Sequence, residues 1–277
     1  MLHGRDRLLG VPGEFAVAEC SGCGLALTQP RLDGDALARH YPDEYEPYRP
    51  PTGALGRLMA ANRRWQVDAK LRLRPFRELE GGRVLDVGCG RGDLAAAFAR
   101  HGFDACGIEP SETAVEAARA LGVDARAGTI EDAPWEPGSF DAVVFNHSLE
   151  HVPDPLDALR RAYDLLRPGG RLAVVVPDWG SRQRRLFGSR WFHLDLPRHL
   201  QHFDAAALDE AVRRAGFEPL ATGTNASASG LPGSVQYALA GRCVFTGGSL
   251  RAALLALMAL YPLTGLLGRP SAGRGDQ

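Results

Sequence analysis

The sequence predicts an α/β fold with a doubly wound, mostly parallel sheet. Over residues 81–223, apolar stretches with the length of buried strands alternate with stretches of helical period. Glycine-rich turns separate the two kinds of stretch, and parallel strands need helical crossovers between them. Ligands of such sheets bind beyond the carboxyl ends of the strands, so the residues that follow each strand are the first candidates for a site.

The alternation defines nine elements in chain order. We expect strands near residues 83–88, 104–108, 123–127, 140–145 and 171–176, and helices near 93–101, 111–121, 155–166 and 204–215. The helix near 155–166 has the clearest start, because Asp154 is a favoured N-cap residue and Pro155 suits the first helical position. This order predicts helices on both faces of the sheet.

Four regions are expected along the chain. Residues 1–50 are short apolar pieces broken by Pro and Gly and are expected to form a degenerate zinc-knuckle region on the acceptor side of the ligand. Residues 51–80 are expected to form a linking amphipathic helix, residues 81–223 the ligand-binding domain, and residues 224–277 an apolar cap or membrane-surface segment. In the apolar stretch 250–267, Arg251, Pro262 and Gly265 shorten any helix below the length that spans a bilayer. A helical cap or a homodimer surface is the preferred interpretation, and contact with a membrane surface stays open.

Composition narrows the class of protein. The net charge of −1 over 277 residues removes the electrostatic case for binding nucleic acid. The N-terminus lacks the apolar core of a signal peptide, and five scattered cysteines do not form a disulfide framework. We therefore expect a cytoplasmic enzyme, with membrane association left open.

The segment 84–94, with the sequence VLDVGCGRGDL, is the most informative motif. Gly88, Gly90 and Gly92 stand at alternate positions, whereas the dinucleotide fingerprint has a third glycine three residues after the second. That spacing argues against a pyrophosphate. Asp86 in the strand suits a ligand with an ammonium or sulfonium end, and Glu109, about 20 residues further on, suits the hydroxyls of a ribose. Together they indicate an adenosyl ligand without phosphates.

Four further segments follow in a characteristic order: 128–135 (GTIEDAPW), 138–141 (GSFD), 146–154 (NHSLEHVPD) and 166–171 (LRPGGR). With the glycine turn and Glu109, they make residues 83–217 resemble the class I S-adenosylmethionine-dependent methyltransferases. The resemblance implies a Rossmann-like fold, S-adenosyl-L-methionine as cofactor, and methyl transfer to a hydroxyl or carbon of a small molecule. A saccharide or lipid-linked acceptor is favoured.

The resemblance and the chemistry of the ligand assign roles in a cofactor site. Asp86 is expected to bind the methionine end of the cofactor, and the backbone of Gly88, Cys89 and Gly90 is expected to pack against the same end. Glu109 is expected to bind the ribose. The adenine and methyl ends involve four further residues: Thr129, Ile130, Glu131 and Asn146. The family often has Asp where this chain has Thr129, and solvated loop charge is the alternative for Glu131.

Histidines supply the candidate catalytic bases. His147 and His151 follow the strand near 140–145, where the methyl group is expected to emerge, although His151 also suits bracing of the next helix start. The loop 191–203 resembles the element that covers the acceptor side in related enzymes. Arg198, His199 and His202 are therefore candidates for acceptor binding or for the base, with packing of the loop as the alternative. Their spacing suits no usual metal site, so no metal is expected.

Cys20 and Cys23 have the spacing of half a zinc knuckle. The resemblance implies a second Cys pair some twenty residues upstream, which here would precede Met1, and His3 is the only nearby substitute. We therefore expect a degenerate site, a tight turn with spare thiols.

Two other functions stay open. Both ends of the chain look incomplete, which suits a non-catalytic subunit that binds an S-adenosyl ligand without turnover. The other is a nicotinamide-dependent oxidoreductase. Such an enzyme needs the glycine spacing of the dinucleotide fingerprint, which this chain lacks, and would bind NADH instead of S-adenosylhomocysteine.

Overall fold

The computed structural model describes residues 1–32, 34–42, 81–224 and 230–243. Its internal contacts divide the chain into two compact units. One comprises Met1–His40, Pro177–Arg213 and Glu218–Gln277, and the other Tyr41–Val176 with Arg214–Phe217. We call them the antiparallel-sheet unit and the parallel-sheet unit. Each unit is discontinuous in sequence, unlike the four expected regions. The expected helix over 51–80 and the apolar stretch 250–267 lie outside the described residues.

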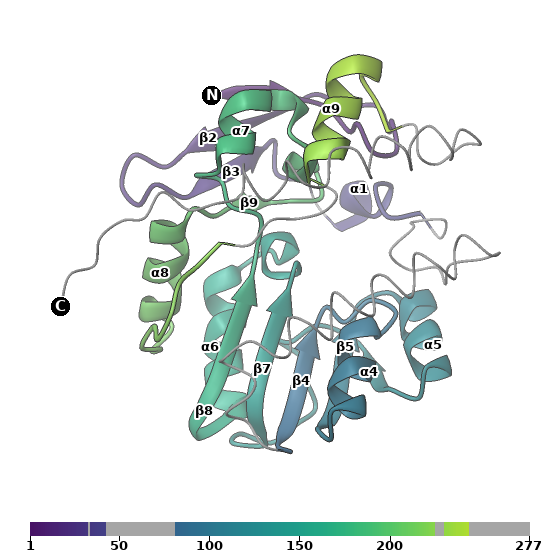
Figure 1. The fold of residues 1–277 in the computed structure, drawn as a ribbon, viewed down its shortest axis with the longest axis vertical. Coiled ribbons are helices and arrows are strands. Elements are labelled where there is room, and N and C mark those ends of the chain that lie inside the picture. The colour runs from purple at the N-terminus through teal and green to yellow at the C-terminus, as the bar shows by residue number, and fades with distance from the viewer. Residues whose placement is uncertain (33, 43–80, 225–229, 244–277) are drawn as a thin grey trace. The chain divides into compact units, whose positions relative to one another are not determined.

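The parallel-sheet unit contains a five-stranded sheet of order β6-β5-β4-β7-β8 (Figure 1). Its strands are β4 (Arg83–Val87), β5 (Asp104–Glu109), β6 (Asp124–Ala127), β7 (Phe140–Asn146) and β8 (Leu166–Val175), all paired in parallel. The chain extends the sheet from β4 to β6 in one direction and then returns to add β7 and β8 on the other side of β4. The order therefore reverses between β4 and β7, where α/β sheets bind their ligands.

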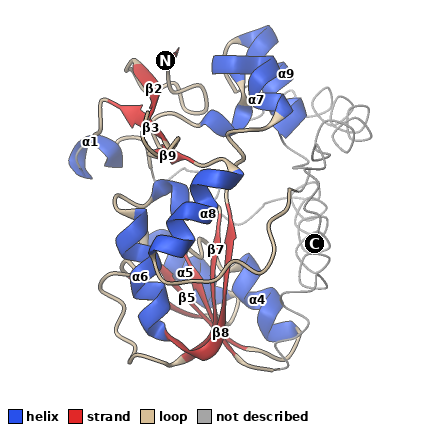
Figure 2. Cartoon of the chain, turned by 90° about the vertical axis from the view of Figure 1, so that its left-hand side faces the viewer, coloured by secondary structure: helices blue, strands red, loops and turns tan. Residues whose placement is uncertain are grey.

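Three helices connect these strands: α4 (Asp93–Arg100), α5 (Glu112–Ala120) and α6 (Pro155–Leu165). Figure 2 shows α4 and α6 on opposite faces of the sheet. Ser111 caps α5 by accepting from the amide of Ala114, and Asp154 caps α6 by accepting from Leu156 and Asp157. The helices bury small and apolar side chains against the sheet, including Phe98 beside Val84 and Val144. The doubly wound parallel fold predicted from the sequence is thus confirmed.

The largest departure from the predicted strands is at β8, which begins at Leu166 instead of residue 171. Phe140 pairs with Leu166 and Ala142 with Arg171, so β7 advances two residues while β8 advances five. The extra residues include Gly169, whose φ of +78° bends the backbone out of the regular ladder. Residues 168–170 (PGG) therefore form an irregular stretch within β8, where the regular pairing with β7 is interrupted.

The antiparallel-sheet unit contains a second, four-stranded sheet that the sequence analysis did not anticipate. Its order is β1 (Leu2–Gly4), β2 (Phe15–Glu19), β3 (Ala26–Gln29) and β9 (Gln201–His202), all antiparallel. These strands are short, and β9 comes from a distant part of the chain, so no local period announces them. The unit also includes α1 (Gly34–Ala38), α7 (Arg182–Phe187), α8 (Ala205–Arg214) and α9 (Gly230–Ala240).

Aromatic side chains fill the core of this unit. Phe15, Val17, Trp179, Trp191 and Leu196 form one buried cluster. The indole of Trp179 also donates to Glu19 Oε1 at 2.7 Å, which satisfies its polar atom. Trp191 and Leu196, which belong to the loop that the sequence analysis expected over the acceptor, therefore also contribute to the core of this unit.

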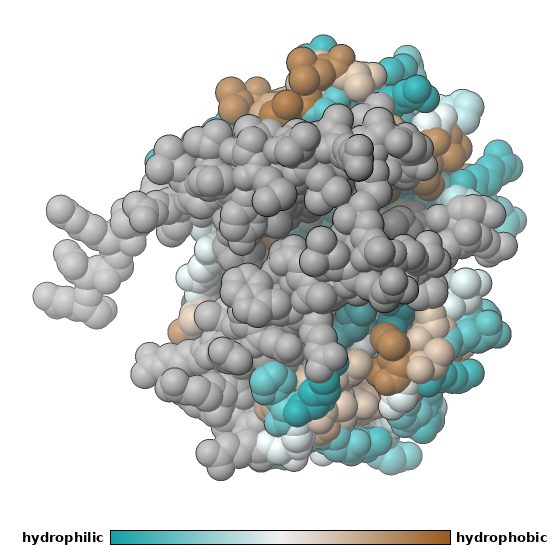
Figure 3. Space-filling model, turned by 45° about the vertical axis from the view of Figure 1, so that its right-hand side comes forward, coloured by the Kyte–Doolittle hydropathy of each residue, from teal (hydrophilic) through white to brown (hydrophobic). Residues whose placement is uncertain are grey.

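The visible surface is mixed. Figure 3 shows hydrophilic and hydrophobic atoms interspersed over the part of this face that belongs to described residues. Within those residues, no helix has the length and apolar character needed to cross a membrane.

Candidate active site

The glycine turn after β4 packs tightly against its surroundings. Gly88, Gly90 and Gly92 have φ values of +69°, +52° and +81°, which side-chain-bearing residues rarely adopt. A Cβ on Gly88 would lie 2.5 Å from the Cβ of Ser148, and one on Gly92 would lie 2.9 Å from the Cβ of Ala118. The glycines are thus required by backbone conformation and, at Gly88 and Gly92, by packing of the chain against itself.

Glu109 ends β5 beside this turn. Its two carboxylate oxygens accept hydrogen bonds from the amides of Gly90 and Ser111, each at 3.0 Å. The residue is buried, and burial raises its pKa, while these two amides and the nearby His151 lower it. A carboxylate offers about four acceptor positions. The described residues therefore leave two of these positions for hydroxyl groups of a ligand.

Asp86 lies in β4, next to β5, with Gly107 as its partner in the register. The side chain is buried, and its pKa is raised to about 7, first by burial and then by repulsion from Glu109. The amide of Ala95 at the start of α4 acts in the opposite direction. Asp86 and Glu109 therefore form a buried acidic pair, whose charged form a positively charged ligand group would stabilise.

Cys89 lies in the same turn. It is buried, and burial together with Asp86 and Glu109 raises the pKa of its thiol. The sulfur would collide with a Cβ on Gly107 at 2.5 Å. The side chain is accordingly a packed, protonated thiol, and only the backbone of Cys89 is suited to contact a ligand.

The loop after β6 contains the three residues assigned to the adenine. Thr129 and Glu131 are exposed, whereas Ile130 is buried. The Thr129 hydroxyl lies 3.5 Å from Asp132 Oδ2, and the carbonyl of Ile130 accepts from the amide of Ala133. In this turn the apolar side chain of Ile130 is buried, and the side chain of Glu131 is exposed to solvent.

The end of β7 bears the candidate bases. Asn146 is the last residue of the strand, and His147 follows with a φ of +58°, unusual for a residue with a Cβ. Its Nδ1 lies 3.6 Å from Oε1 of Glu150, a carboxylate with 1% of its side chain exposed, while the His147 side chain is 41% exposed. A buried carboxylate thus faces a half-exposed imidazole at the point where the strand order reverses.

His151 ends the 3₁₀ turn Leu149–His151 on the same loop. Its Nδ1 is 2.9 Å from the hydroxyl of Tyr41, and the two rings meet edge to face. Because His151 also acts electrostatically on Glu109, the structure brings Tyr41, His151 and the acidic pair to one end of the parallel sheet.

Sequence reasoning missed one member of this cluster, Ser148. Its hydroxyl donates to the carbonyl of Val87 at 2.5 Å and so joins the ends of β4 and β7. The only signal was the absence of a side chain at Gly88, which leaves the space that Ser148 fills.

The remaining candidates belong to the antiparallel-sheet unit. Arg198 has no exposed side-chain surface. It forms a bidentate pair with Asp6, at 2.9 and 3.0 Å, and a further pair with Asp195 at 2.6 Å. Asp6 also accepts from His40 Nδ1 at 2.9 Å, and these contacts hold the pKa of Asp6 below its usual value against the effect of burial. Arg198 thus ties three chain segments together.

His199 and His202 are also engaged within that unit. The Nδ1 of His199 lies 3.0 Å from the carbonyl of His193, and its Nε2 lies 3.9 Å from Asp195. His202 Nε2 lies 3.0 Å from the hydroxyl of Thr28. Burial first, and Arg184 second, lower the pKa of His202 to about 3. His202 is therefore a neutral core residue at ordinary pH.

Cys20 and Cys23 lie in the turn between β2 and β3. Both thiols are free and exposed, and the turn is closed by hydrogen bonds from Cys20 to Leu25 and from Gly24 to Cys20. Among the described residues, no third metal-binding side chain groups with these two thiols.

The order β6-β5-β4-β7-β8, with a glycine turn after β4 and an acidic residue at the end of β5, defines a Rossmann-like fold of the class I methyltransferase type. A family model described as a methyltransferase domain matches residues 59–222. An S-adenosylmethionine-dependent methyltransferase from Archaeoglobus fulgidus has a similar fold, with a TM-score of 0.51, 18% identity and coverage of 75% of this chain and 90% of that one.

Curated relatives show closer sequence similarity. The ubiquinone biosynthesis O-methyltransferase of Xanthomonas campestris is 43% identical over 131 residues, 40% of this chain and 55% of the relative. That of Xanthomonas euvesicatoria is 41% identical over 183 residues, 57% of this chain and 77% of the relative. The chain thus spans about half the length of the first of these relatives. The protein belongs to the methyltransferase-domain family, within the class I S-adenosylmethionine-dependent methyltransferases, as the sequence motifs indicated.

Proposed function

We propose that the protein transfers a methyl group from S-adenosyl-L-methionine to a hydroxyl of a small molecule. The observation that carries the proposal is the buried acidic pair, Asp86 and Glu109, at the end of two neighbouring strands and beside a glycine turn. An oxygen acceptor is supported by the name of the relatives, which are O-methyltransferases. A saccharide or lipid-linked acceptor remains the narrower form of the proposal.

In this proposal Glu109 holds the ribose with the acceptor positions that Gly90 and Ser111 leave unused. Asp86 holds the methionine end, because an ammonium or sulfonium group offsets the burial and the repulsion from Glu109 that raise its pKa. The backbone of Gly88, Cys89 and Gly90 packs against the methionine end. Thr129, Ile130 and Glu131 surround the adenine, with Ile130 as the apolar contact, and Asn146 lies near the methyl group.

Methyl transfer from a sulfonium needs alignment above all, since the donor is already activated. A hydroxyl acceptor also needs a general base. We assign that role first to His147, whose partly exposed imidazole faces the buried carboxylate of Glu150. His151, held by Tyr41, is the second candidate for the base. His199 belongs to the other unit, where its ring contacts His193 and Asp195, and stays a candidate on the acceptor side.

Calorimetric titration with S-adenosylhomocysteine tests the cofactor site without a known acceptor. We expect micromolar binding, about −8 kcal/mol, in the wild-type chain. Glu109→Gln places an amide NH₂ opposite a backbone amide and should weaken binding at least tenfold. Glu112→Gln, on the exposed start of α5 three residues away, is the matched control and should bind like wild type.

Three outcomes would contradict the proposal. Equal affinity of Glu109→Gln and Glu112→Gln for S-adenosylhomocysteine would show that Glu109 does not bind the cofactor. Binding of NADH instead of S-adenosylhomocysteine would favour the oxidoreductase alternative. Binding without turnover across a panel of phenols, nucleotide sugars and lipid-linked sugars would favour the non-catalytic subunit.

The homodimer and membrane-surface contact expected from the apolar stretch 250–267 are separate proposals. Sedimentation and flotation with lipid vesicles, with and without residues 244–277, test them directly.

A further inference from the structure

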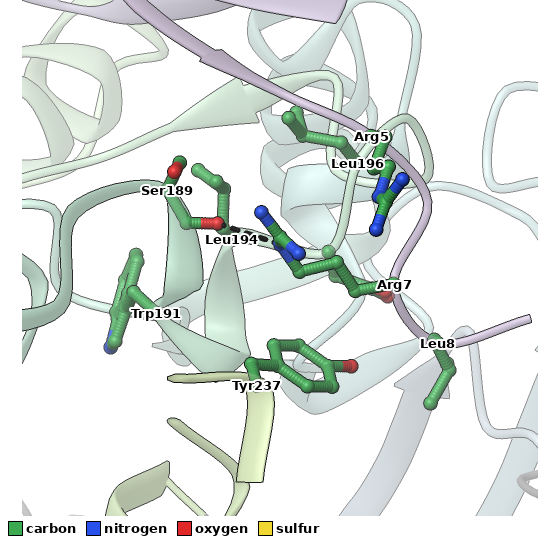
Figure 4. A pocket seen from close by; sticks show the side chains of 9 residues that line it. Arg5, Arg7, Leu8, Ser189, Trp191, Leu194, Leu196 and Tyr237 are labelled. Carbon is green, nitrogen blue, oxygen red and sulfur yellow. Dashed lines mark hydrogen bonds between the residues drawn. The ribbon is translucent and has the colours of Figure 1, made fainter. Parts of the chain in front are cut away.

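A small hollow in the antiparallel-sheet unit has a positively charged wall. It is shallow and open to solvent, and Arg5 and Arg7 form that wall (Figure 4). Trp191, Leu194 and Leu196 form an apolar wall, and Tyr237 from α9 completes the rim. The hollow is built from the N-terminal segment, the turns after α7 and the last turns of α9.

Arg7 is held rigidly in this wall. Its Nε donates to the carbonyl of Ser189 at 3.1 Å, and its Nη1 donates to the carbonyl of Gly241 at 2.8 Å. The amide of Cys243 in turn donates to the carbonyl of Arg7 at 2.8 Å. The Nη2 group makes no hydrogen bond with a described residue, so part of a fixed guanidinium remains available as a donor.

Arg5 brings a second guanidinium to the same turn. Its Nη2 lies 3.8 Å from the position of a Cβ on Gly241, the residue whose carbonyl Arg7 binds. Arg5 is exposed and pairs with no carboxylate among the described residues. Burial first, and then Arg5 and Arg190, lower the pKa of Arg7. Positive charge thus accumulates here beyond what the described residues around it neutralise.

Asp195 is the one carboxylate among the described residues that line the hollow, and it does not compensate this charge. Asp195 accepts three hydrogen bonds from Arg198, at 2.6 and 3.1 Å, and so forms part of the buried ion-pair network. Tyr237 is buried, and burial and Asp195 raise the pKa of its hydroxyl. The hydroxyl therefore stays protonated and is a hydrogen-bond donor.

We propose that this hollow binds the phosphate group of a small phosphate ester. Arg5 and Arg7 supply charge and N–H donors, the Tyr237 hydroxyl supplies a third donor, and Leu194 and Leu196 contact the adjoining carbon atoms of the ester. A phosphate matches this set better than a carboxylate, because it presents three oxygens and a charge near −2 to three donor groups.

The first experiment uses inorganic phosphate as the probe. The full chain is titrated at constant ionic strength against chloride, and binding is followed by calorimetry and by the shift in Tm. We expect phosphate to bind and to raise the Tm. Arg5→Ala and Tyr237→Phe should each weaken binding at least fivefold. Arg182→Ala, which removes an exposed arginine of α7 outside the hollow, is the matched control and should bind like wild type.

The proposal is overturned if phosphate binds no better than chloride, or if Arg182→Ala weakens binding as much as Arg5→Ala. Affinity for S-adenosylhomocysteine, measured on the same samples, reports on the parallel-sheet unit. Failure of the phosphate site and failure of the proposed methyl transfer are therefore separate results.

A second experiment identifies the source of the phosphate. Glycerol 3-phosphate is compared with phosphatidylcholine vesicles that do or do not contain phosphatidic acid. Binding of glycerol 3-phosphate that depends on Arg5 supports a soluble ester. Binding only to the vesicles that contain phosphatidic acid, again lost in Arg5→Ala, supports a lipid headgroup. Binding to neither ligand contradicts the proposal for an ester.

Discussion

Ser148 occupies the space that a side chain on Gly88 would need. A Cβ on Gly88 would lie 2.5 Å from the Cβ of Ser148, and the Ser148 hydroxyl donates to the carbonyl of Val87 at 2.5 Å. The carboxyl ends of β4 and β7 are joined through this contact, at the point where the order of the sheet reverses.

Gly88→Ala is therefore expected to lower the free energy of unfolding by about 3 kcal/mol, the sum of a positive φ and an overlap with Ser148. Gly122→Ala is the matched control, because Gly122 has a φ of +83° and open space around it. Its cost should be about 1 kcal/mol. Urea denaturation measures both values.

A second substitution, Ser148→Gly, distinguishes the cost of the steric overlap from the cost of the backbone strain, because it removes the Cβ that the new side chain would meet. In that background Gly88→Ala should cost about as much as Gly122→Ala, roughly 1 kcal/mol. An unchanged cost of Gly88→Ala would mean that the contact with Ser148 has no energetic weight.

Asp86→Asn should stabilise the ligand-free protein at high pH. The folded-state pKa of Asp86, about 7, lies above the usual value of 3.8. The wild-type chain therefore loses stability as the pH rises from 3.8 to 7. In this range the carboxyl group of Asp86 is ionised in the unfolded chain, and folding must return a proton to it. The variant escapes this loss, and the difference at pH 8 should be about 2–4 kcal/mol in its favour.

Denaturation at pH 5, 6, 7 and 8 measures this difference. Asp124→Asn, at an exposed position of β6, is the control and should stay within about 0.5 kcal/mol of wild type. A stability difference for Asp86→Asn that does not change between pH 5 and pH 8 would contradict the prediction.

His147→Asn tests the proposed base. Asparagine tolerates the left-handed backbone of residue 147, so the variant keeps the loop while removing the imidazole. On a true acceptor kcat should fall by about 10²–10⁴-fold, with affinity for S-adenosylhomocysteine unchanged. His101→Asn, at the exposed end of α4, is the control. Full activity in His147→Asn would assign the base to another residue, with His151 tested next.

Arg198→Met should be strongly destabilising, because it leaves the buried Asp6 and the partly buried Asp195 without their cation. Loss of one partner of a buried pair costs about 3–5 kcal/mol, whereas Arg213→Met, which removes an exposed pair with Asp209 on α8, should cost less than about 0.5 kcal/mol.

The pH dependence gives Arg198→Met a second readout. Arg198 holds the pKa of Asp6 below 3.8, so its contribution is present above that pH and is lost as the pH falls. The deficit of the variant should therefore shrink between pH 7 and pH 3. A deficit that is constant over this range would mean that lost packing, and not lost charge, is responsible.

The sequence by itself determined the parallel sheet and the helices that connect its strands. Its strands and helices have local signatures: apolar runs for β4, β5 and β7, Asp154 before Pro155 for α6, and the glycine turn after β4. The parallel direction of the strands follows from the alternation alone, and Asp86 and Glu109 were assigned from their positions around the glycine turn. Such features depend on neighbours within a few residues, which is why a linear reading finds them.

Only the tertiary structure decided what lies outside that sheet and its helices and how the site residues are partnered. β9 pairs with a strand about 175 residues earlier, and Arg198 meets Asp6 across 192 positions. The tertiary structure also showed that Tyr41 contacts His151 and that Ser148 fills the space at Gly88. Long-range pairings of this kind are set by the burial of short segments against one another, and no local period in the sequence records that burial.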